Sequence, residues 1–264
     1  MSIMLKLTDI TKTFNPGTVT EKKVLRGLDL ELEDGDFVTI IGGNGAGKST
    51  LLNLIAGVHY TDTGSIVLDG ENLTGKPEYY RARYLGRVFQ DPMMGTAANM
   101  EIEENLAMAM RRGKKRGLAW HIKNDEKEFY KEKLALLDLG LENRMTAKVG
   151  LLSGGQRQAL TLLMATLQRP KLLLLDEHTA ALDPKTARKV LELTEELVAK
   201  DKLTTFMVTH NMRDAIRFGN RLIMMMDGQI VFDVRGEEKQ KLTVEDLLEK
   251  FEASGVVSDK LLGA

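Results

Sequence analysis

Cysteine is absent from this chain of 264 residues, which excludes disulfide bonds and thiolate metal sites. The longest apolar runs, in KLLLLD and RLIMMMD, have the length of strands and fall far short of the roughly 18 residues of a membrane span. The formal net charge is −1, so the chain has no overall basic field to attract nucleic acid. The first residues, MSIMLKLTDI, have too short an apolar part for a signal peptide. We therefore expect a cytoplasmic chain, which would need membrane spans from other chains to work at a membrane.

What the chain does contain is an alternation of strand and helix patterns, which is typical of an α/β protein with a mainly parallel sheet. Alternating apolar and polar residues predict antiparallel strands in IMLKLTDITKTF and LDLELE. Continuously apolar stretches predict buried strands at Phe37–Ile41, in GRVFQDP, in KLLLLD and in LTTFMVTH. The strand in GRVFQDP is expected to end at Gln90, just before Pro92. Between about residues 91 and 150 the sequence becomes helical, charged and rich in methionine, which predicts an insertion. RLIMMMDGQIVFD predicts a β-hairpin that turns at Asp227–Gly228.

The segment GGNGAGKST fits the pattern G-x-x-x-x-G-K-[ST], and it lies between a predicted strand and a predicted helix. Glycines let the backbone curl so that its amides, and the helix start behind them, face phosphate oxygens. The ammonium of Lys48 would neutralise the β- and γ-phosphates, and the Ser49 hydroxyl would bind Mg²⁺. The segment does not fit the dinucleotide-binding pattern G-x-G-x-x-G, because Lys48 stands where the third glycine is needed. An ordinary glycine turn is disfavoured because the loop lies between a predicted strand and a predicted helix. The residues predicted to contact nucleotide here are Asn44, Gly45, Ala46, Gly47, Lys48, Ser49 and Thr50.

The run LLLLDE predicts a strand buried on both faces, with Asp176 emerging at its carboxyl end. Ligands bind at that end of the strands in α/β sheets, so Asp176 is expected beside the phosphate loop, where it would hold Mg²⁺. Glu177 would point at the γ-phosphate and polarise the attacking water. Beside a phosphate loop, the alternative of a strand-end turn with solvated acids is disfavoured. His178 follows directly and, because it titrates near neutral pH, it is a further candidate for proton chemistry or metal binding.

A second glycine-rich segment, LSGGQ, spans residues 152–156. Ser153 is of the type that caps the start of a helix. Its hydroxyl and the backbone amides of Gly154 and Gly155 would then form a second anion site. One chain therefore offers two phosphate-binding helix starts, about a hundred residues apart.

These motifs together resemble those of the ATP-binding cassette (ABC) ATPase family, in the family's order and over nearly the whole chain. The matching pieces are GGNGAGKST (Walker A), Gln90 of VFQDP (Q-loop), LSGGQ (signature), LLLLDE (Walker B), ALD ending at Asp183 (D-loop) and His210 of VTHN (switch histidine). The resemblance implies a P-loop NTPase core with a mainly parallel sheet, an N-terminal antiparallel β subdomain and an inserted α-helical subdomain. It divides a single domain into a core of residues 1–90 and 160–235, a helical insertion of residues 91–159 and a C-terminal helical tail of residues 236–264.

The same resemblance implies that the chain hydrolyses ATP and uses Mg²⁺. The residues that it assigns to catalysis are Lys48, Gln90, Glu177 and His210. Those that it assigns to Mg²⁺ are Ser49, Gln90 and Asp176. Phe14, in TKTFNPG, matches the aromatic residue that stacks on adenine in this family.

The resemblance further implies that two copies pair head to tail and enclose two ATP molecules. The γ-phosphate held by one copy would be contacted by residues of the other copy, namely Ser153, Gly155 and Gln156. Asp183 would contact the phosphate loop of the other copy. ATP would favour the closed pair because it bridges both surfaces, and hydrolysis would remove that bridge.

The chain departs from the family pattern at several supporting positions. His178 stands where proline is common and Ala180 where serine or asparagine is common, while Ala159 and Met164 replace frequent arginines. Histidine restores a backbone N–H and frees φ, so we expect His178 to act through local shape, with a proton or metal role left open. The combination of DPMMGTAANMEIEENLAMAMRRGKKRG with DEHTAALDPKT resembles the cassettes of bacterial tryptophan/tyrosine-type uptake systems.

Two classes of function therefore compete. The first is the ATPase subunit of a membrane transporter, an importer of a small solute such as an amino acid, at the cytoplasmic face of the membrane. Its partners would be integral membrane permease subunits and an extracytoplasmic substrate-binding protein, and not nucleic acid. The second is a soluble cassette that acts on ribosomes or DNA, for which long coiled-coil insertions or paired cassettes would be expected and are absent.

Two further features of the insertion can each be interpreted in two ways. The basic run at residues 111–116 would be either a solvated loop, which we favour, or a contact to anionic lipid or a membrane subunit. The methionines would form either an adaptable docking groove for a membrane-subunit helix or ordinary core. They are Met93, Met94, Met100, Met108 and Met110.

Overall fold

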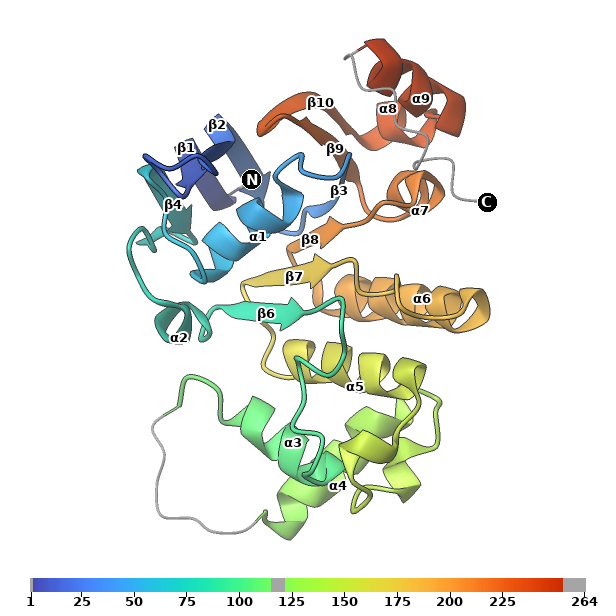
Figure 1. Ribbon diagram of the computed structural model, residues 1–264. Coiled ribbons are helices and arrows are strands. Elements are labelled where there is room, and N and C mark those ends of the chain that lie inside the picture. Colours follow the sequence, from blue (N-terminus) through green and yellow to red (C-terminus); the bar gives the residue numbers. More distant parts are fainter. Residues whose placement is uncertain (1, 115–121, 254–264) are drawn as a thin grey trace. The chain divides into compact units, whose positions relative to one another are not determined.

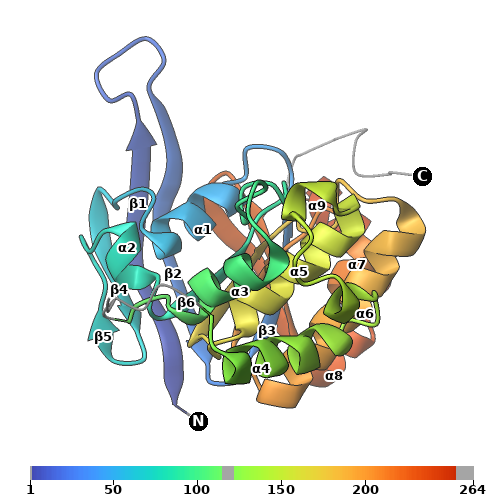
Figure 2. The same cartoon turned by 90° about the horizontal axis from the view of Figure 1, so that it is seen from below.

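The structure is a computed structural model that describes residues 2–114 and 122–253 (Figures 1 and 2). These residues form two compact units, each of which is described by itself. Unit 1 consists of the described parts of Met1–Arg81 and Lys202–Ala264, and unit 2 of those of Ala82–Asp201. No helix in the described ranges is both long and apolar enough to cross a membrane.

Unit 1 contains the predicted antiparallel sheet, drawn in blue to teal in Figure 1. Its strands lie in the order β2-β1-β4-β5 and comprise Lys22–Glu33, Ile3–Phe14, Thr63–Leu68 and Glu71–Asn72. Leu7 and Ile10 of β1 are both buried, although strict alternation would place them on opposite faces. A register shift between them, with Asp9 at φ 49°, returns Ile10 to the core face.

A second set of strands in unit 1 is mainly parallel, as predicted. β3 (Phe37–Gly42) is buried along its whole length and pairs in parallel with β8 (Thr205–Val208) and β9 (Arg221–Met226). β10 (Gln229–Arg235) returns antiparallel to β9 through the predicted turn, where Asp227 and Gly228 have φ of 45° and 78°. The helices of unit 1 are α1 (Lys48–Ala56), α2 (Glu78–Arg81), α7 (Met212–Arg217), α8 (Gly236–Gln240) and α9 (Val244–Ala253).

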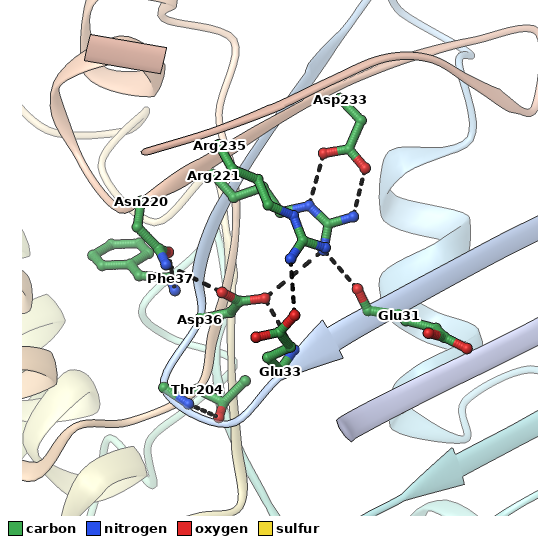
Figure 3. A network of polar contacts seen from close by, with 10 residues as sticks. Glu31, Glu33, Asp36, Phe37, Thr204, Asn220, Arg221, Asp233 and Arg235 are labelled. Atoms are coloured by element: carbon green, nitrogen blue, oxygen red, sulfur yellow. Dashed lines mark hydrogen bonds and ion pairs between the residues drawn. The ribbon is translucent and has the colours of Figure 1, made fainter. Parts of the chain in front are cut away.

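Buried Arg221 ties strands of unit 1 together (Figure 3). Its Nε donates to the Asp233 carboxylate of β10 at 2.7 Å, and its Nη1 donates to the Glu31 carbonyl of β2 at 2.6 Å. Asp36, between β2 and β3, lies 3.8 Å from the same guanidinium. One side chain thus joins the antiparallel strands to the mainly parallel ones, with its charge compensated by two carboxylates.

Unit 2 contains one parallel strand pair and a set of helices. β6 (Leu85–Val88) pairs with β7 (Leu172–Asp176) in a register that sets Val88 opposite Leu175. The helices are α3 (Ile102–Met110), α4 (Asn124–Ala135), α5 (Gly154–Thr166) and α6 (Pro184–Asp201), with short 3-10 helices at Leu141–Asn143 and Val149–Leu151. The predicted insertion of residues 91–159 falls inside unit 2, which also holds β6, β7 and α6. The division into core, insertion and tail stays a prediction.

Candidate functional site

The phosphate loop of unit 1 connects β3 to α1, as predicted. Gly47 caps α1 with φ 101°, and a β-carbon there would meet a Leu25 side-chain carbon at 2.7 Å, so only glycine fits. Lys48 is buried, and its Nζ donates to the carbonyls of Gly42 at 2.7 Å and Gly43 at 3.1 Å. The loop is therefore wrapped around the ammonium group. Asn44, Gly45 and Ser49 are exposed, Thr50 is half-buried and Ala46 is buried.

His210 lies at the same edge of the sheet as this loop. Ile40 of β3 and Val208 of β8 are in register, so Gly42 and His210 each lie two residues further toward the carboxyl end. His210 is exposed, and the next residue, Asn211, caps α7 by accepting bonds from two backbone amides of that helix. The sequence predicted this placement of His210 correctly.

Phe14 ends β1 and is half-buried. Its ring meets that of His59 edge to face, with centroids 5.2 Å apart and an angle of 81°. The ammonium of Lys12 lies 5.6 Å from the Phe14 centroid. His59 belongs to no sequence motif, so the sequence did not point to it. In the structure, the His59 ring supports the aromatic ring of Phe14 that is predicted to bind adenine.

In unit 2, three predicted residues come together at the carboxyl edge of β6 and β7. Val88 and Leu175 are in register, so Gln90 and Glu177 each lie two residues beyond them, and Asp176 ends β7. The prediction that Gln90 ends the strand is corrected by two residues, because β6 already ends at Val88. Glu177 has a left-handed backbone, with φ 44°.

The signature segment forms the capped helix start that the sequence predicted. Ser153 caps α5: its Oγ accepts from the Gln156 amide at 3.3 Å, and the Ser153 amide donates to Gln156 Oε1 at 3.2 Å. Ser153 and Gly154 are exposed. A β-carbon on Gly155 would lie 2.1 Å from a methyl of Thr186, so this glycine allows α5 to approach α6 closely.

Two residues that motif reading did not single out tie the Q-loop to the signature helix. Buried Gln158 of α5 donates from Nε2 to the Phe89 carbonyl at 3.0 Å, directly before Gln90. Arg157 bonds the sulfur of Met93 and also donates to the carbonyls of Gly150 and others before α5. The only feature of the sequence that could have indicated this role of Arg157 and Gln158 is their position directly after LSGGQ.

Asp183 is exposed and caps the start of α6. Its Oδ1 accepts from the Thr186 amide at 3.1 Å, and hydrogen bonds from the Thr186 side chain and backbone hold the pKa of Asp183 below its ordinary value. Asp183 therefore stays ionised and anchors the start of α6.

His178 is only 2% exposed, which speaks against a proton or metal role. Its Nε2 lies 3.1 Å from Thr194 Oγ1, and burial lowers the pKa of His178 to about 4. The imidazole is therefore neutral near pH 7. Within the described residues, no cluster of three or more His, Asp or Glu side chains is suited to a metal ion.

The structure bears on the two features of the insertion that had two possible interpretations, namely the five methionines and the basic run at residues 111–116. Of the five methionines, Met93, Met94 and Met108 are exposed and none is buried, which contradicts the reading as ordinary core. In the basic run, Arg111 pairs with Glu126 at 3.1 Å and Arg112 donates to the Ala165 carbonyl at 3.3 Å. Arg111 and Arg112 are thus half-buried and bonded within unit 2, whereas Gly113 and Lys114 are exposed, as expected of a solvated loop. Residues 115 and 116 lie outside the described part.

A glycine-rich phosphate loop opening a helix, and an acidic strand end on a buried parallel strand, define a P-loop nucleoside-triphosphatase. Within that class, the family model described as "ABC transporter" matches residues 25–180, more than half of the chain. The chain belongs to the ABC transporter ATPase family, so it binds and hydrolyses ATP as a transporter subunit.

Known relatives support this membership. The chain is 45% identical to the "Tyrosine transport ATP-binding protein" of Clostridioides difficile, over 94% of this chain and 99% of that protein. It is 34% identical to the "Spermidine/putrescine import ATP-binding protein PotA" of Marinobacter nauticus over 86% of this chain, which spans only 56% of that protein.

Solved structures agree with the fold. The ADP conformation of the ATP-binding cassette MJ1267 superposes with a TM-score of 0.78 at 29% identity, covering 96% of this chain and 99% of that one. A dimeric post-hydrolysis state of the cassette MJ0796, bound to ADP and Pi, gives 0.74 at 28% identity, covering 88% and 98%. The α/β fold with antiparallel and parallel strands is thereby confirmed as that of an ABC cassette.

Proposed function

We propose that two copies of this chain close head to tail on two ATP molecules and drive import of a small solute through separate membrane subunits. The observation that carries the proposal is the 45% identity to a tyrosine transport ATP-binding protein over nearly both whole chains. An aromatic amino acid is the solute class that this relative suggests. An extracytoplasmic substrate-binding protein would deliver the solute, and the chain would act at the cytoplasmic face of the membrane.

The two phosphate-binding helix starts support the head-to-tail pairing. The phosphate loop belongs to unit 1, and the exposed Ser153 at the start of α5 belongs to unit 2. In the pair, Ser153, Gly155 and Gln156 of one copy contact the γ-phosphate that the other copy holds, and Asp183 contacts the other copy's phosphate loop. The related cassette MJ0796 forms a dimer, which supports pairing of two copies.

The residues fit Mg²⁺ and a hydrolytic role. Mg²⁺ prefers hard oxygen ligands and usually keeps phosphate and water ligands beside one or two from protein. Ser49, Gln90 and Asp176 offer a hydroxyl, an amide and a carboxylate of this kind, and the ion would neutralise charge on the phosphates. Glu177 takes the proton of the attacking water, Lys48 stabilises the charge on the γ-phosphate, and His210 donates a hydrogen bond to it.

The exposed methionines of unit 2 support contact with a membrane subunit. Met93 follows the Q-loop and is 45% exposed, and Met94 is 69% exposed. Flexible thioether side chains adapt to an apolar helix more readily than branched ones. The segment after Gln90 is therefore our candidate for docking a permease helix.

The substitution Glu177→Gln tests the catalytic assignment. The variant should bind ATP, lose at least roughly 100-fold in turnover because the base is gone, and sediment as an ATP-bound dimer. Single-turnover hydrolysis and sedimentation velocity measure these effects. Glu196→Gln, on the exposed side of α6, is the matched control and should behave as wild type. Hydrolysis by Glu177→Gln at the wild-type rate would remove Glu177 as the base.

The transporter assignment is tested by purifying the chain from membranes together with its membrane partners. Reconstituted in vesicles with those partners and the binding protein, it should accumulate labelled tyrosine or tryptophan only when ATP is present. Accumulation of spermidine instead would overturn the solute class. Recovery of ribosomes or DNA, without an integral membrane partner, would overturn the transporter function.

A further inference from the structure

The backbone at Glu177 adopts a conformation that the surrounding structure must hold. Its φ of 44° is in the left-handed region, which a residue with a β-carbon disfavours. Glu177 is also the first residue after β7, so the ladder of the sheet no longer supports it. The Glu177 carbonyl accepts from the Ala180 amide at 3.0 Å, which closes a turn over residues 177–180. Contacts that hold this turn in unit 2 therefore also bear on where the Glu177 carboxylate lies.

The next residue, His178, supplies such a contact. Its ring is buried, and Nε2 lies 3.1 Å from Oγ1 of Thr194, which is 1% exposed in the middle of α6. Thr194 Oγ1 donates its own hydrogen to the Val190 carbonyl at 2.8 Å. The hydroxyl can then only accept from the imidazole, so Nε2 carries the hydrogen and donates it.

The same helix holds the other end of this segment. Asp183 caps α6 through the Thr186 amide, as described above. The segment of residues 177–183 is thus attached to α6 at both ends, once by His178 and once by Asp183. It carries Glu177 at its first position and the D-loop aspartate at its last.

We propose that His178 is a positioning residue, whose hydrogen bond to Thr194 fixes the turn at Glu177 and so keeps that carboxylate in place for hydrolysis. This inference rests on the proposed role of Glu177 as the base. A buried imidazole without a partner would be unfavourable, so Thr194 is a required part of the arrangement. His178 acts through Glu177 and does not touch the nucleotide.

The test removes the acceptor while leaving the histidine in place. Thr194→Val is nearly isosteric, and we expect it to lower kcat roughly 5- to 50-fold, because small displacements of a reacting group are costly to rate. KM for ATP should stay within about twofold, since the phosphate loop belongs to unit 1. The separate variant Thr194→Ser keeps the hydroxyl and should have a kcat close to that of the wild type.

The chain offers a matched control in Thr166 of α5. It is buried, and its Oγ1 donates to the carbonyls of Leu162 and Leu163 at 3.0 and 3.1 Å, without a histidine partner. Thr166→Val should therefore lower the melting temperature, by less than Thr194→Val does because no buried imidazole loses its partner, and should keep kcat. All rates are compared well below the melting temperature of the least stable variant.

A double-variant comparison identifies the bond as the cause. His178→Leu should lower kcat about as much as Thr194→Val, and the double variant should be no slower than either single one. Wild-type kcat in Thr194→Val, or a double variant whose loss is the product of the two single losses, would overturn the proposal. Glu177→Gln separates the two hypotheses: if it is inactive while Thr194→Val is fully active, only the positioning role fails.

Discussion

The side-chain amide of Gln158 donates to the backbone carbonyl of Phe89 at 3.0 Å, across 69 residues of sequence. Gln158 lies in the second turn of the helix that begins with the signature motif, and Phe89 directly precedes the Q-loop glutamine. The bond therefore links two motifs that the sequence presents separately. Within the described residues, Gln158 Oε1 is buried without a hydrogen-bond partner, so the donated bond is the anchor of this side chain.

Replacing Gln158 by leucine should release the Q-loop. We expect the free energy of unfolding to fall by about 1–3 kcal/mol, because the Phe89 carbonyl loses its donor, and kcat to fall several-fold. Urea unfolding and steady-state ATPase assays measure the two effects. Gln168→Leu is the control, since Gln168 makes the same kind of bond to the Ala109 carbonyl at 2.8 Å away from the Q-loop. Equal kcat in both variants would show that the link has no role in turnover.

Mixing two inactive variants should recover ATPase activity if the sites form between copies. A Lys48→Ala chain lacks the phosphate-loop ammonium, and a Ser153→Phe chain lacks the signature hydroxyl. In a head-to-tail pair, one of the two sites of each mixed dimer is intact, so an equal mixture should regain about a quarter of wild-type activity. Neither variant alone should be active.

The mixing experiment would give the opposite result if each ATP site lay within one copy. If Lys48 and Ser153 of one copy served the same nucleotide, every site in the mixture would carry one defect and the activity would stay at background. Because Ser153 also caps α5, its loss should cost about 1 kcal/mol of stability, and a melting curve checks that both chains remain folded.

Phe14 should contribute to ATP affinity through its ring. Phe14→Ala should raise KM for ATP roughly tenfold, in line with the loss of one base–aromatic stack, while kcat at saturation changes little. Phe14→Tyr keeps the ring and should keep KM. An unchanged KM in Phe14→Ala would leave the ring with a purely structural role beside His59.

Arg221 should matter for stability and not for catalysis. Arg221→Met leaves the carboxylates of Asp36 and Asp233 without their shared cation, so the free energy of unfolding should fall by about 3–5 kcal/mol. Arg235→Met breaks an exposed pair with Glu33 at 3.2 Å and should cost at most about 1 kcal/mol. Urea unfolding of both variants measures the difference, and similar losses would contradict the network in Figure 3.

Much of the fold could be read from local pattern. The Asp227–Gly228 turn and the buried strand at Phe37–Gly42 both depend on residues that are neighbours in sequence. The end of β6 was misjudged by two residues, because an apolar run does not reveal where strand pairing stops. The methionines were ambiguous for a similar reason, since periodicity cannot tell a buried face from an exposed one.

The sequence by itself determined the phosphate loop, the carboxylates, the signature helix start and the switch histidine, because each is a short motif whose spacing carries its chemistry. Only the tertiary structure decided how these motifs are supported. His178 finds its partner sixteen residues away and Gln158 finds its own sixty-nine residues away. Such bonds depend on which elements pack together, and packing brings side chains into contact regardless of their separation along the chain.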